Sequence, residues 1–411
     1  MRILYNVGIY LYLTAIKIYS LFDSKAKLWV DGRKDIFKQL KSKINNNNEK
    51  IAWFHSASLG EFEQGRPVIE KFKVKYPDYK ILLTFFSPSG FEIRKNYQNA
   101  DYIFYLPIDT PANAKRFVEI VKPKVVFFIK YEFWFNYLNA LKDKDIPVYL
   151  ISGIFRPSQH FFKQYVSWYR KQLSCFTFFF VQNNTSKELL NNIKYNNVLI
   201  SGDTRFDRVY AIADQKKSFP LIEQFKGNDT KLILAGSTWE PDEDLIIESI
   251  KLDEPNVKYI IAPHETHQER ITKLKEKLGD SVVLFSQANE NNIKDAKVII
   301  IDGIGYLSHV YQYADIAIIG GGFGKGIHNI LEAATFGVPI IFGPNYKKFT
   351  EAVELNSLGG AFAISNKNEF NIILKELISD DDKRQKASNI CKNYVNNNIG
   401  ASDIILNNIT F

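Results

Sequence analysis

Hydrophobic positions in the first half of the chain form short continuous runs separated by helix-length amphipathic segments. The runs occupy positions 51–54, 81–86, 102–106, 125–129, 148–151, 176–181 and 198–200. They are continuous instead of alternating with polar residues, which is typical of strands buried on both faces of a parallel sheet. The first half is therefore predicted to be an α/β domain.

A second series of hydrophobic runs repeats this rhythm without repeating the sequence. It occupies positions 232–235, 259–262, 282–285, 298–301, 316–319, 340–342 and 361–364. Two such halves predict two doubly wound Rossmann-like domains facing each other across an interdomain cleft, with ligands at the carboxyl ends of the strands. We expect an N-terminal helix over 1–24, a first domain over 25–209, a linker over 210–229 and a second domain over 230–411. The asparagine tract at 45–48 is a further predicted linker, and a polar helix at 380–397 is expected to close the chain.

The N-terminal helix is predicted to be amphipathic, with a single charge, Lys17, between positions 3 and 22. Its polar positions recur at helical spacing, as do its apolar positions: Asn6, Tyr10, Thr14, Lys17 and Ser20 against Leu4, Gly8, Leu11, Ala15, Ile18 and Phe22. This pattern favours a helix lying in a membrane interface. Two alternatives remain open: the helix packs on its own domain, or it spans a bilayer, since 20 residues cover about 30 Å.

Charge is concentrated at the N-terminus. The whole chain carries 53 Lys and Arg against 45 Asp and Glu, for a net charge of +8, and positions 1–45 hold nine of these basic residues against three Asp. A local basic excess favours an anionic surface such as a membrane as the partner, and disfavours nucleic acid. With 45% hydrophobic and 24% charged residues, the composition excludes a disordered chain. The two cysteines, Cys175 and Cys391, lie in unrelated contexts, so no disulfide framework or cysteine zinc site is expected.

The segment 55–61 follows the first predicted strand and opens a helix. Ser58 and Glu61 have the spacing of a capping box, in which each side chain caps the other's backbone amide. The same position, at a strand-to-helix turn, would suit Glu61 as a general base. Glu132 also follows a predicted strand, as either a cleft residue or a loop carboxylate paired with a lysine.

A glycine-rich segment at 320–329 contains Lys325, His328 and Asn329. It leads into a predicted helix that contains Glu332. Glycines at a helix start can cradle a phosphate or sugar nucleotide, although ordinary turn chemistry explains them too. The spacing matches neither the P-loop nor the dinucleotide fingerprint, which disfavours a kinase or a nicotinamide dehydrogenase.

Two further loops of the second half carry polar side chains that could bind a ligand. Ser237 and Thr238 follow its first strand, where they could contact an anion or cap a helix. His264 and His267 share the next loop with two glutamates, but without the spacing of a known metal motif, so no metal site is expected.

Together these residues resemble the 3-deoxy-D-manno-octulosonic acid (Kdo) transferases, which are lipid A glycosyltransferases. The resemblance covers essentially the whole chain and depends on the segments 53–61, 132–134, 202–209, 235–238, 328–332 and 342–344. The run Gly-Asp-Thr-Arg-Phe-Asp-Arg-Val at 202–209, which contains Arg205, is the most specific of them. The resemblance implies a GT-B fold, with an N-terminal domain for the lipid acceptor and a C-terminal domain for the donor CMP-Kdo.

The resemblance also implies a role for individual residues. Glu61 would be the general base of an inverting transfer to a lipid A precursor, and Glu132 the second acidic residue. Substrate contacts would come from both halves: Ser58, Gly60, Arg205, Ser237, Thr238, His264, His267, Lys325, His328, Asn329 and Glu332. No cofactor and no metal would be needed, because helix-start amides and basic groups can stabilise the leaving CMP. The enzyme would act in lipopolysaccharide biosynthesis, attached to the cytoplasmic face of the bacterial inner membrane.

The chain departs from the family pattern at several positions. Lys130 replaces an acidic residue, Phe135 a proline, Ile327 a glycine, and His264 the arginine of a Pro-Arg-His motif. Without that arginine, Lys325, His264, His267 and Arg270 are candidates for neutralising the CMP phosphate. Two other functions stay open: a GT-B enzyme that uses a UDP-sugar, either an epimerase or a lipid glycosyltransferase, and a non-catalytic sugar-nucleotide-binding scaffold at a membrane.

Overall fold

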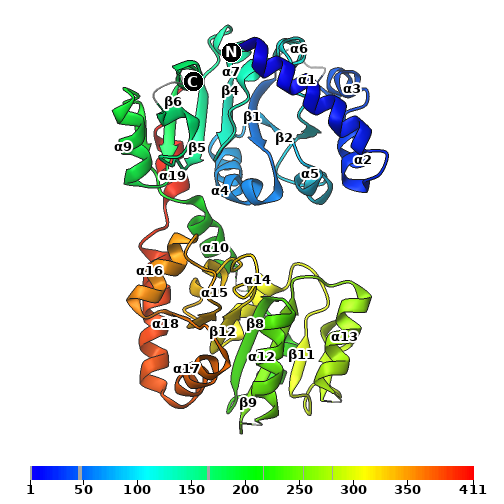
Figure 1. Cartoon of the computed structure of the whole chain (residues 1–411), viewed down its shortest axis with the longest axis vertical. Coiled ribbons are helices and arrows are strands. Elements are labelled where there is room, and N and C mark those ends of the chain that lie inside the picture. Colours follow the sequence, from blue (N-terminus) through cyan, green and yellow to red (C-terminus); the bar gives the residue numbers. More distant parts are fainter. Residues whose placement is uncertain (1, 45–48, 164–166, 216, 253, 280) are drawn as a thin grey trace. The chain divides into compact units, whose positions relative to one another are not determined.

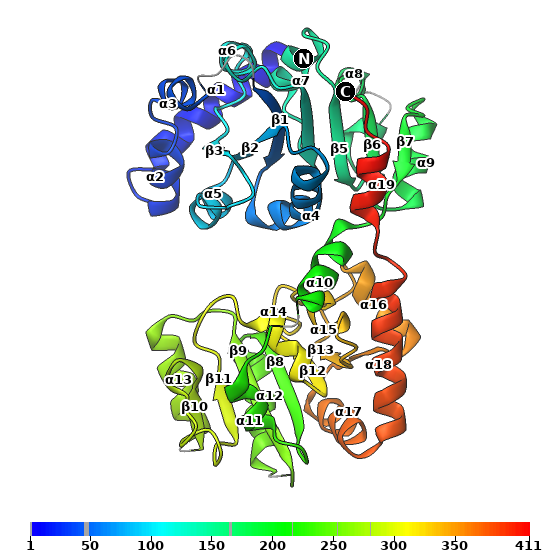
Figure 2. The same cartoon turned by 180° about the vertical axis from the view of Figure 1, so that it is seen from behind.

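A computed structural model describes residues 2–44, 49–163, 167–215, 217–252, 254–279 and 281–411. The predicted linker at 45–48 lies outside these residues. The chain forms two compact units, each built around one parallel sheet (Figures 1 and 2). Unit 1 comprises Met1–Arg208 and Ile399–Phe411, and unit 2 comprises Val209–Asn398.

Unit 1 contains a seven-stranded parallel sheet in the order β3-β2-β1-β4-β5-β6-β7. Its strands are β1 (Lys50–Ser56), β2 (Tyr79–Phe85), β3 (Tyr102–Tyr105), β4 (Val125–Ile129), β5 (Val148–Gly153), β6 (Phe178–Val181) and β7 (Val198–Ile200). All seven predicted strands are confirmed. Side chains of successive strand residues enter opposite cores, so Trp53 and Phe128 pack on one face and Phe54 and Phe127 on the other.

Helices cover both faces of the first sheet. One core takes buried residues from α3 (Ile36–Lys43), α6 (Pro111–Val121), α7 (Phe135–Lys142), α8 (Ser167–Leu173) and α9 (Asn184–Asn192). The other takes them from α4 (Leu59–Lys75) and α19 (Ala401–Asn407), with α5 (Pro88–Arg94) packed beside them.

Unit 2 repeats this architecture with the sheet order β10-β11-β9-β8-β12-β13-β14. Its strands are β8 (Lys231–Thr238), β9 (Val257–Pro263), β10 (Val282–Leu284), β11 (Val298–Ile300), β12 (Ile316–Ile319), β13 (Ile340–Phe342) and β14 (Ala361–Ala363). The seven strands predicted for the second half are confirmed as well. Its helices are α11 (Pro220–Lys226), α12 (Glu240–Lys251), α13 (Gln268–Leu278), α14 (Leu307–Val310), α15 (Leu331–Ala334), α16 (Thr350–Leu358), α17 (Lys367–Ser379) and α18 (Asp381–Asn396).

The structure differs from the predicted domain boundaries in two places. The stretch 210–229, expected to be a linker, contains the end of α10 (Thr204–Asp214) and all of α11, whose Ile222 and Phe225 are buried. The polar helix at 380–397 forms as α18, but it does not close the chain. The chain instead returns to unit 1, where α19 packs against α4 and the Tyr149 hydroxyl donates to Thr410 O over 2.6 Å.

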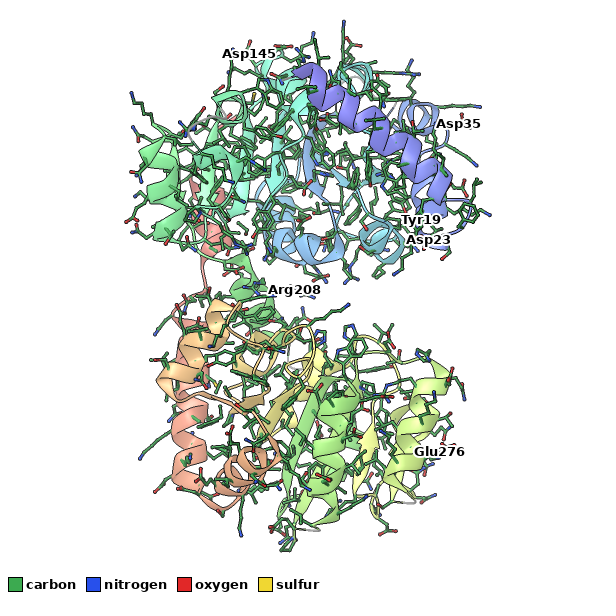
Figure 3. The ribbon with its side chains drawn as sticks, in the orientation of Figure 1. Tyr19, Asp23, Asp35, Asp145, Arg208 and Glu276 are labelled. Carbon is green, nitrogen blue, oxygen red and sulfur yellow. The ribbon has the colours of Figure 1, made fainter. Side chains whose placement is uncertain are left out.

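The N-terminal helix α1 (Arg2–Tyr19) is held on unit 1 by its polar and aromatic side chains. The Tyr5 hydroxyl donates to Asp109 over 2.6 Å, and Asn136 donates to Asn6 over 2.9 Å. The following helix is α2 (Ser24–Asp31). Asp23, which lies shortly after Tyr19 at the end of α1, caps this helix, because its carboxylate accepts a hydrogen bond from the Ala26 amide (Figure 3). The side of α1 that faces the protein comprises the partly buried Tyr5, Asn6, Ile9, Leu13 and Ile16, whereas Tyr10, Thr14 and Lys17 of the predicted polar side are exposed.

The predicted apolar side of α1 faces outward. Leu4, Leu11, Ile18 and Phe22 are 67%, 66%, 58% and 83% exposed, and no residue of the helix is fully buried. The helix does pack on its own domain, as the first alternative predicted, through Tyr5, Asn6 and Tyr12, but it does not use this apolar side to do so. None of the helices in the described ranges is long and apolar enough to cross a bilayer.

Candidate active site

The candidate site residues follow the strands at which each sheet reverses its order. In unit 1, Glu61 follows β1 and Glu132 follows β4, and these two strands are neighbours. In unit 2, Ser237 lies at the end of β8 and the glycine-rich loop follows the neighbouring β12. Loops at such a reversal diverge to opposite faces of the sheet and leave a crevice at the carboxyl ends of the strands.

Glu61 lies in the first turn of α4. Its surroundings bear on both roles predicted for it, helix capping and general base. Its carboxylate accepts the backbone N–H of Ser58 over 3.1 Å, so it caps its own helix. Burial, and then the nearby charge of Glu132, raise the pKa of Glu61 to about 7 despite the opposing effect of the capping amides. Capping fixes the position of this carboxylate, and its surroundings give it the pKa of a general base working near neutrality.

Glu132 is buried, with 6% exposure, and is held by two ring nitrogens. Trp134 Nε1 donates to its Oε2, and His55 Nε2 lies 3.1 Å from the same oxygen. Burying a carboxylate is costly unless donors compensate it, and these two aromatic side chains supply them. The sequence indicated Glu132 but not its two partners.

His55 is the centre of a buried hydrogen-bond chain. Its Nδ1 lies 2.8 Å from Thr84 Oγ1, which accepts from Trp53 Nε1 over 2.7 Å. Two tautomers fit these contacts. A proton on Nε2 can be donated to Glu132 while the Thr84 hydroxyl donates to Nδ1. A proton on Nδ1 can instead be donated to Thr84 O over 3.1 Å while Nε2 accepts from Trp134 Nε1 over 3.0 Å.

Basic side chains surround the two glutamates. Lys130, just before Glu132, adopts a left-handed backbone conformation with φ of 68°, which is strained for a lysine. Its pKa is lowered by burial and by the charge of Arg205, while Glu61 acts in the opposite direction. Arg205 is anchored by Asp203, whose carboxylate accepts from Arg205 Nε over 2.8 Å. The structure thus brings Glu61, Glu132, Lys130 and Arg205 into one electrostatic neighbourhood.

Gly60, beside Glu61, is not required by the fold. It is exposed, and no atom lies within 4 Å of the position that a Cβ would occupy. A glycine in a helix costs about 1 kcal/mol relative to alanine. Open space at such a position is what the close approach of a ligand would need.

Three aromatic rings stack at the site of unit 2. The rings of Trp239 and His264 lie 4.8 Å apart, and those of His264 and His328 lie 4.3 Å apart. Trp239 Nε1 donates to His328 Nε2 over 3.1 Å, which requires that nitrogen to be unprotonated. Consistently, burial and the neighbouring His264 lower the pKa of His328 to about 4. The sequence indicated both histidines but missed Trp239.

The glycine-rich loop has structural reasons for its glycines. A Cβ at Gly320 would lie 2.3 Å from Ser237 O, and one at Gly322 would lie 2.5 Å from Gly343 N. The amide of Gly321, a candidate phosphate donor, instead donates to Asp242 over 2.9 Å. Backbone packing therefore accounts for Gly320 and Gly322. Nothing in the sequence indicated that Asp242 would accept a hydrogen bond from the Gly321 amide.

Some predicted ligand-binding side chains of unit 2 are engaged elsewhere. The Thr238 hydroxyl is buried and donates to Glu243 over 2.8 Å; Glu243 also holds Arg270 in a buried ion pair. Thr238 therefore does not present its hydroxyl to the site, and Arg270 does not replace the missing family arginine. Ser237, with φ of 53°, lies where β8 slips against β9 and is partly exposed.

The remaining predicted residues lie near helix starts. His267 Nδ1 accepts the amide of Arg270 over 3.3 Å and thus caps α13. Asn329 donates to Glu332 over 3.1 Å at the start of α15. Lys325 is exposed in the glycine-rich loop. Within the described ranges, no three or more His, Cys, Asp or Glu residues are grouped so that they could hold a metal ion.

Comparison with known proteins shows similarity to one family of transferases. Residues 33–208 match the family model of 3-deoxy-D-manno-octulosonic-acid transferase (kdotransferase). The chain is 28% identical to the 3-deoxy-D-manno-octulosonic acid transferase of Aquifex aeolicus, covering 84% of this chain and 91% of that protein. It is 24% identical to the Haemophilus influenzae transferase of the same name, covering 86% and 85%.

Solved structures show the same fold at lower identity. The UDP-GlcNAc 2-epimerase of Neisseria meningitidis superimposes with a TM-score of 0.62 at 19% identity, covering 87% of this chain and 98% of that chain. Acinetobacter baumannii MurG gives 0.53 at 13% identity, covering 87% and 98%. The two Rossmann-like units and these matches show a GT-B fold. With this fold, the chain is similar over most of its length to Kdo transferases, which are glycosyltransferases.

Proposed function

We propose that this enzyme transfers Kdo from CMP-Kdo to a lipid A precursor, with inversion at the anomeric carbon. The observation that carries the proposal is Glu61, a fixed and buried carboxylate with a pKa of about 7 at the strand reversal of unit 1. The names of the relatives support Kdo as the transferred sugar.

In the proposed reaction, a hydroxyl oxygen of the acceptor attacks the anomeric carbon of Kdo. The bond from that carbon to the CMP phosphate oxygen breaks, CMP leaves with the electron pair, and Glu61 takes the hydroxyl proton. Glu132 is held in place by His55 and Trp134, and its negative charge raises the pKa of Glu61, which makes Glu61 a stronger base. Lys130 and Arg205 give this part of unit 1 positive charge for an anionic substrate group.

We assign the donor nucleotide to unit 2. The exposed loop of Lys325 and the ring stack of Trp239, His264 and His328 lie after adjacent strands there. A neutral imidazole at His328 can contact a nucleotide without adding a charge. Ser237, Asn329 and Glu332 complete the proposed donor site, and we propose no cofactor or metal.

We also propose a peripheral location at the cytoplasmic face of the inner membrane. The outward apolar side of α1 supports it, because exposed Leu4, Leu11, Ile18 and Phe22 would be covered by lipid. The same helix is anchored to unit 1 through Tyr5 and Asp109, so unit 1 would be held at the surface.

The test is a product assay on the wild type and on Glu61→Gln. With CMP-Kdo and a tetraacyl lipid A precursor, the wild type should release CMP and give a lipid heavier by the mass of Kdo. Glu61→Gln should lose about 10²- to 10⁴-fold of the rate, while retaining CMP binding in calorimetry. Replacing CMP-Kdo by UDP-sugars tests the alternative donor, and a chelator arm tests the independence from metal. An unchanged lipid mass with the wild type would contradict the proposed reaction.

A further inference from the structure

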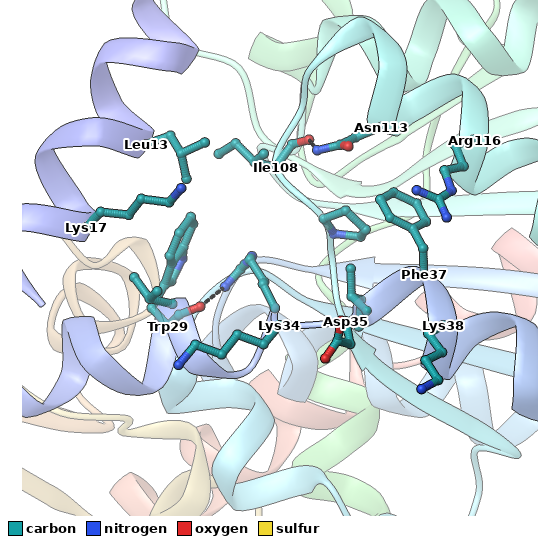
Figure 4. A pocket seen from close by; sticks show the side chains of 14 residues that line it. Leu13, Lys17, Trp29, Lys34, Asp35, Phe37, Lys38, Ile108, Asn113 and Arg116 are labelled. Atoms are coloured by element: carbon teal, nitrogen blue, oxygen red, sulfur yellow. Dashed lines mark hydrogen bonds between the residues drawn. The ribbon is translucent and has the colours of Figure 1, made fainter.

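A second pocket of unit 1 lies between the N-terminal helices and the start of α6. Its volume is about 530 Å³, and 14 residues line it (Figure 4). Leu13 and Lys17 contribute to it from α1, and Trp29 from α2. The pocket is lined by neither Glu61 nor Glu132, and the proposed transfer does not use it.

The pocket combines a positive rim with apolar walls. Five cationic residues line it: Lys17, Arg33, Lys34, Lys38 and Arg116. Asp35 is the only carboxylate among the 14 lining residues. Trp29, Ile108 and Pro107 provide buried apolar surface between these charges.

Most of this positive charge is not neutralised by the protein. Arg33 is held by three backbone carbonyl oxygens, of Leu106, Trp29 and Phe86, at 2.9, 2.9 and 2.7 Å. Among the described residues no carboxylate forms an ion pair with Arg33, Lys17, Lys38 or Arg116; Lys34 pairs with Asp31. The guanidinium of Arg33 also lies over the rings of Trp29, Phe86 and Tyr105. A cation held by carbonyl dipoles and aromatic rings keeps its full charge, which raises the positive potential of the pocket beside it.

Trp29 contributes an apolar wall of the pocket. It is 4% exposed, and the guanidinium of Arg33 lies 3.8 Å from the centre of its ring.

We infer that this pocket binds the phosphate headgroup of an anionic phospholipid. The cationic rim fits a phosphate diester, and the apolar walls fit the glycerol and first acyl carbons. Leu13 and Lys17 belong to the helix whose outward side is apolar, so acyl chains leaving the pocket would follow α1. The inference rests on the proposed placement of α1 at a membrane, and it is independent of the transfer reaction.

Titration with short-chain lipids below their micelle concentration tests the pocket without a membrane. Dihexanoyl phosphatidylglycerol should bind once per chain in calorimetry, and dihexanoyl phosphatidylcholine and inorganic phosphate should not saturate. Lys38→Gln with Arg116→Gln should weaken the binding about thirtyfold, since each basic residue beside an anionic lipid contributes roughly fivefold in affinity.

The matched control removes the same amount of positive charge from unit 1 outside the pocket. Lys25 and Lys27 are exposed on α2 and do not line the pocket. Lys25→Gln with Lys27→Gln should leave the binding within about twofold of the wild type, because monomeric lipid presents no extended charged surface. An equal loss in both double variants would overturn the pocket in favour of diffuse attraction.

Three other outcomes would also overturn the inference. Equal binding of inorganic phosphate would make this a soluble-anion site, and equal binding of phosphatidylcholine would make it an apolar groove. One-for-one displacement of phosphatidylglycerol by the tetraacyl lipid precursor would assign the pocket to the acceptor. Glu61→Gln should bind the short-chain lipid with the same affinity as the wild type. Loss of the proposed transfer reaction can therefore be distinguished from loss of lipid binding in the pocket.

Discussion

His55 Nε2 lies 3.1 Å from Glu132 Oε2, and this contact links the active-site carboxylates to the interior of the first sheet. His55 is fully buried and faces Thr84 on the neighbouring strand, where the two residues are register partners. The charge that raises the pKa of Glu61 is therefore held in place by a strand pairing.

The pH dependence of transfer should report the interaction between the two glutamates. The base must be deprotonated, so kcat/KM for the wild type should rise with pH through about 7, the pKa of Glu61. Glu132→Gln removes the negative charge that raises this pKa, so the acidic limb should move to lower pH. An acidic limb at the same pH in the variant would show that Glu132 does not act on Glu61.

Folding stability should show the cost of keeping Glu61 in its site. Burial raises the pKa of Glu61 in the folded state to about 7, above its ordinary value of 4.5. The folded state therefore binds the proton more tightly than the unfolded state, and stability is lost as pH rises from about 4.5 to about 7. At pH 8, Glu61→Gln should be more stable than the wild type by about 2 kcal/mol, after allowance for partial exposure to solvent.

The free energy of unfolding of the wild type and of Glu61→Gln is measured by urea denaturation at pH 4 and at pH 8. The difference should nearly vanish at pH 4, where the wild-type carboxyl is protonated in both states. A variant less stable than the wild type at pH 8 would mean that the cap on Ser58 outweighs the cost of the charge.

Thr84→Val should break the chain that orients His55. Valine keeps the shape of threonine but leaves Trp53 Nε1 and His55 Nδ1 without the hydroxyl. We expect a loss of about 1–3 kcal/mol in the free energy of unfolding. The pH profile of transfer should move as well, because His55 loses its contact with the Thr84 hydroxyl and no longer holds Glu132 in a fixed position. A stability loss with an unmoved profile would reduce Thr84 to a packing role.

Asp207→Asn should loosen the C-terminal helix from unit 1. The buried Asp207 carboxylate accepts the amides of Gly400 and Ser402, both over 2.6 Å. We expect a loss of about 1–3 kcal/mol and faster hydrogen exchange in α19. Asp403→Asn is the control, since Asp403 forms an exposed pair with Lys71, worth less than about 1 kcal/mol. Equal effects of the two substitutions would contradict a specific role for Asp207.

The strands could be predicted because continuous apolar runs identify elements buried on both sides. The return of the C-terminus to unit 1 could not, since the contacts of Asp207 with Gly400 and Ser402 join residues far apart in the sequence. Local patterns carry no information on such pairing. The same run, 202–209, had been singled out by resemblance, and the structure shows one physical use for it.

The site was only partly predictable for the same reason. Glu61 and Glu132 could be found because each follows a predicted strand. The roles of Thr84 and Asp242 depend on which strands are neighbours, which the sequence does not state. A usable signal was present at Thr84, a polar residue inside an otherwise apolar strand, since such residues usually have a buried partner.

The hydrogen bonds from Gly400 and Ser402 to Asp207 attach α19 to unit 1. They affect the order in which parts of the chain can fold during synthesis. An N-terminal domain generally folds while the rest of the chain is still being made. Here Ile405 and Leu406 complete a core of the first unit, and they are synthesised after the whole of unit 2. The helix that carries Glu61 therefore acquires its final packing only after unit 2 has been made, and until then its apolar surface is open to chaperones.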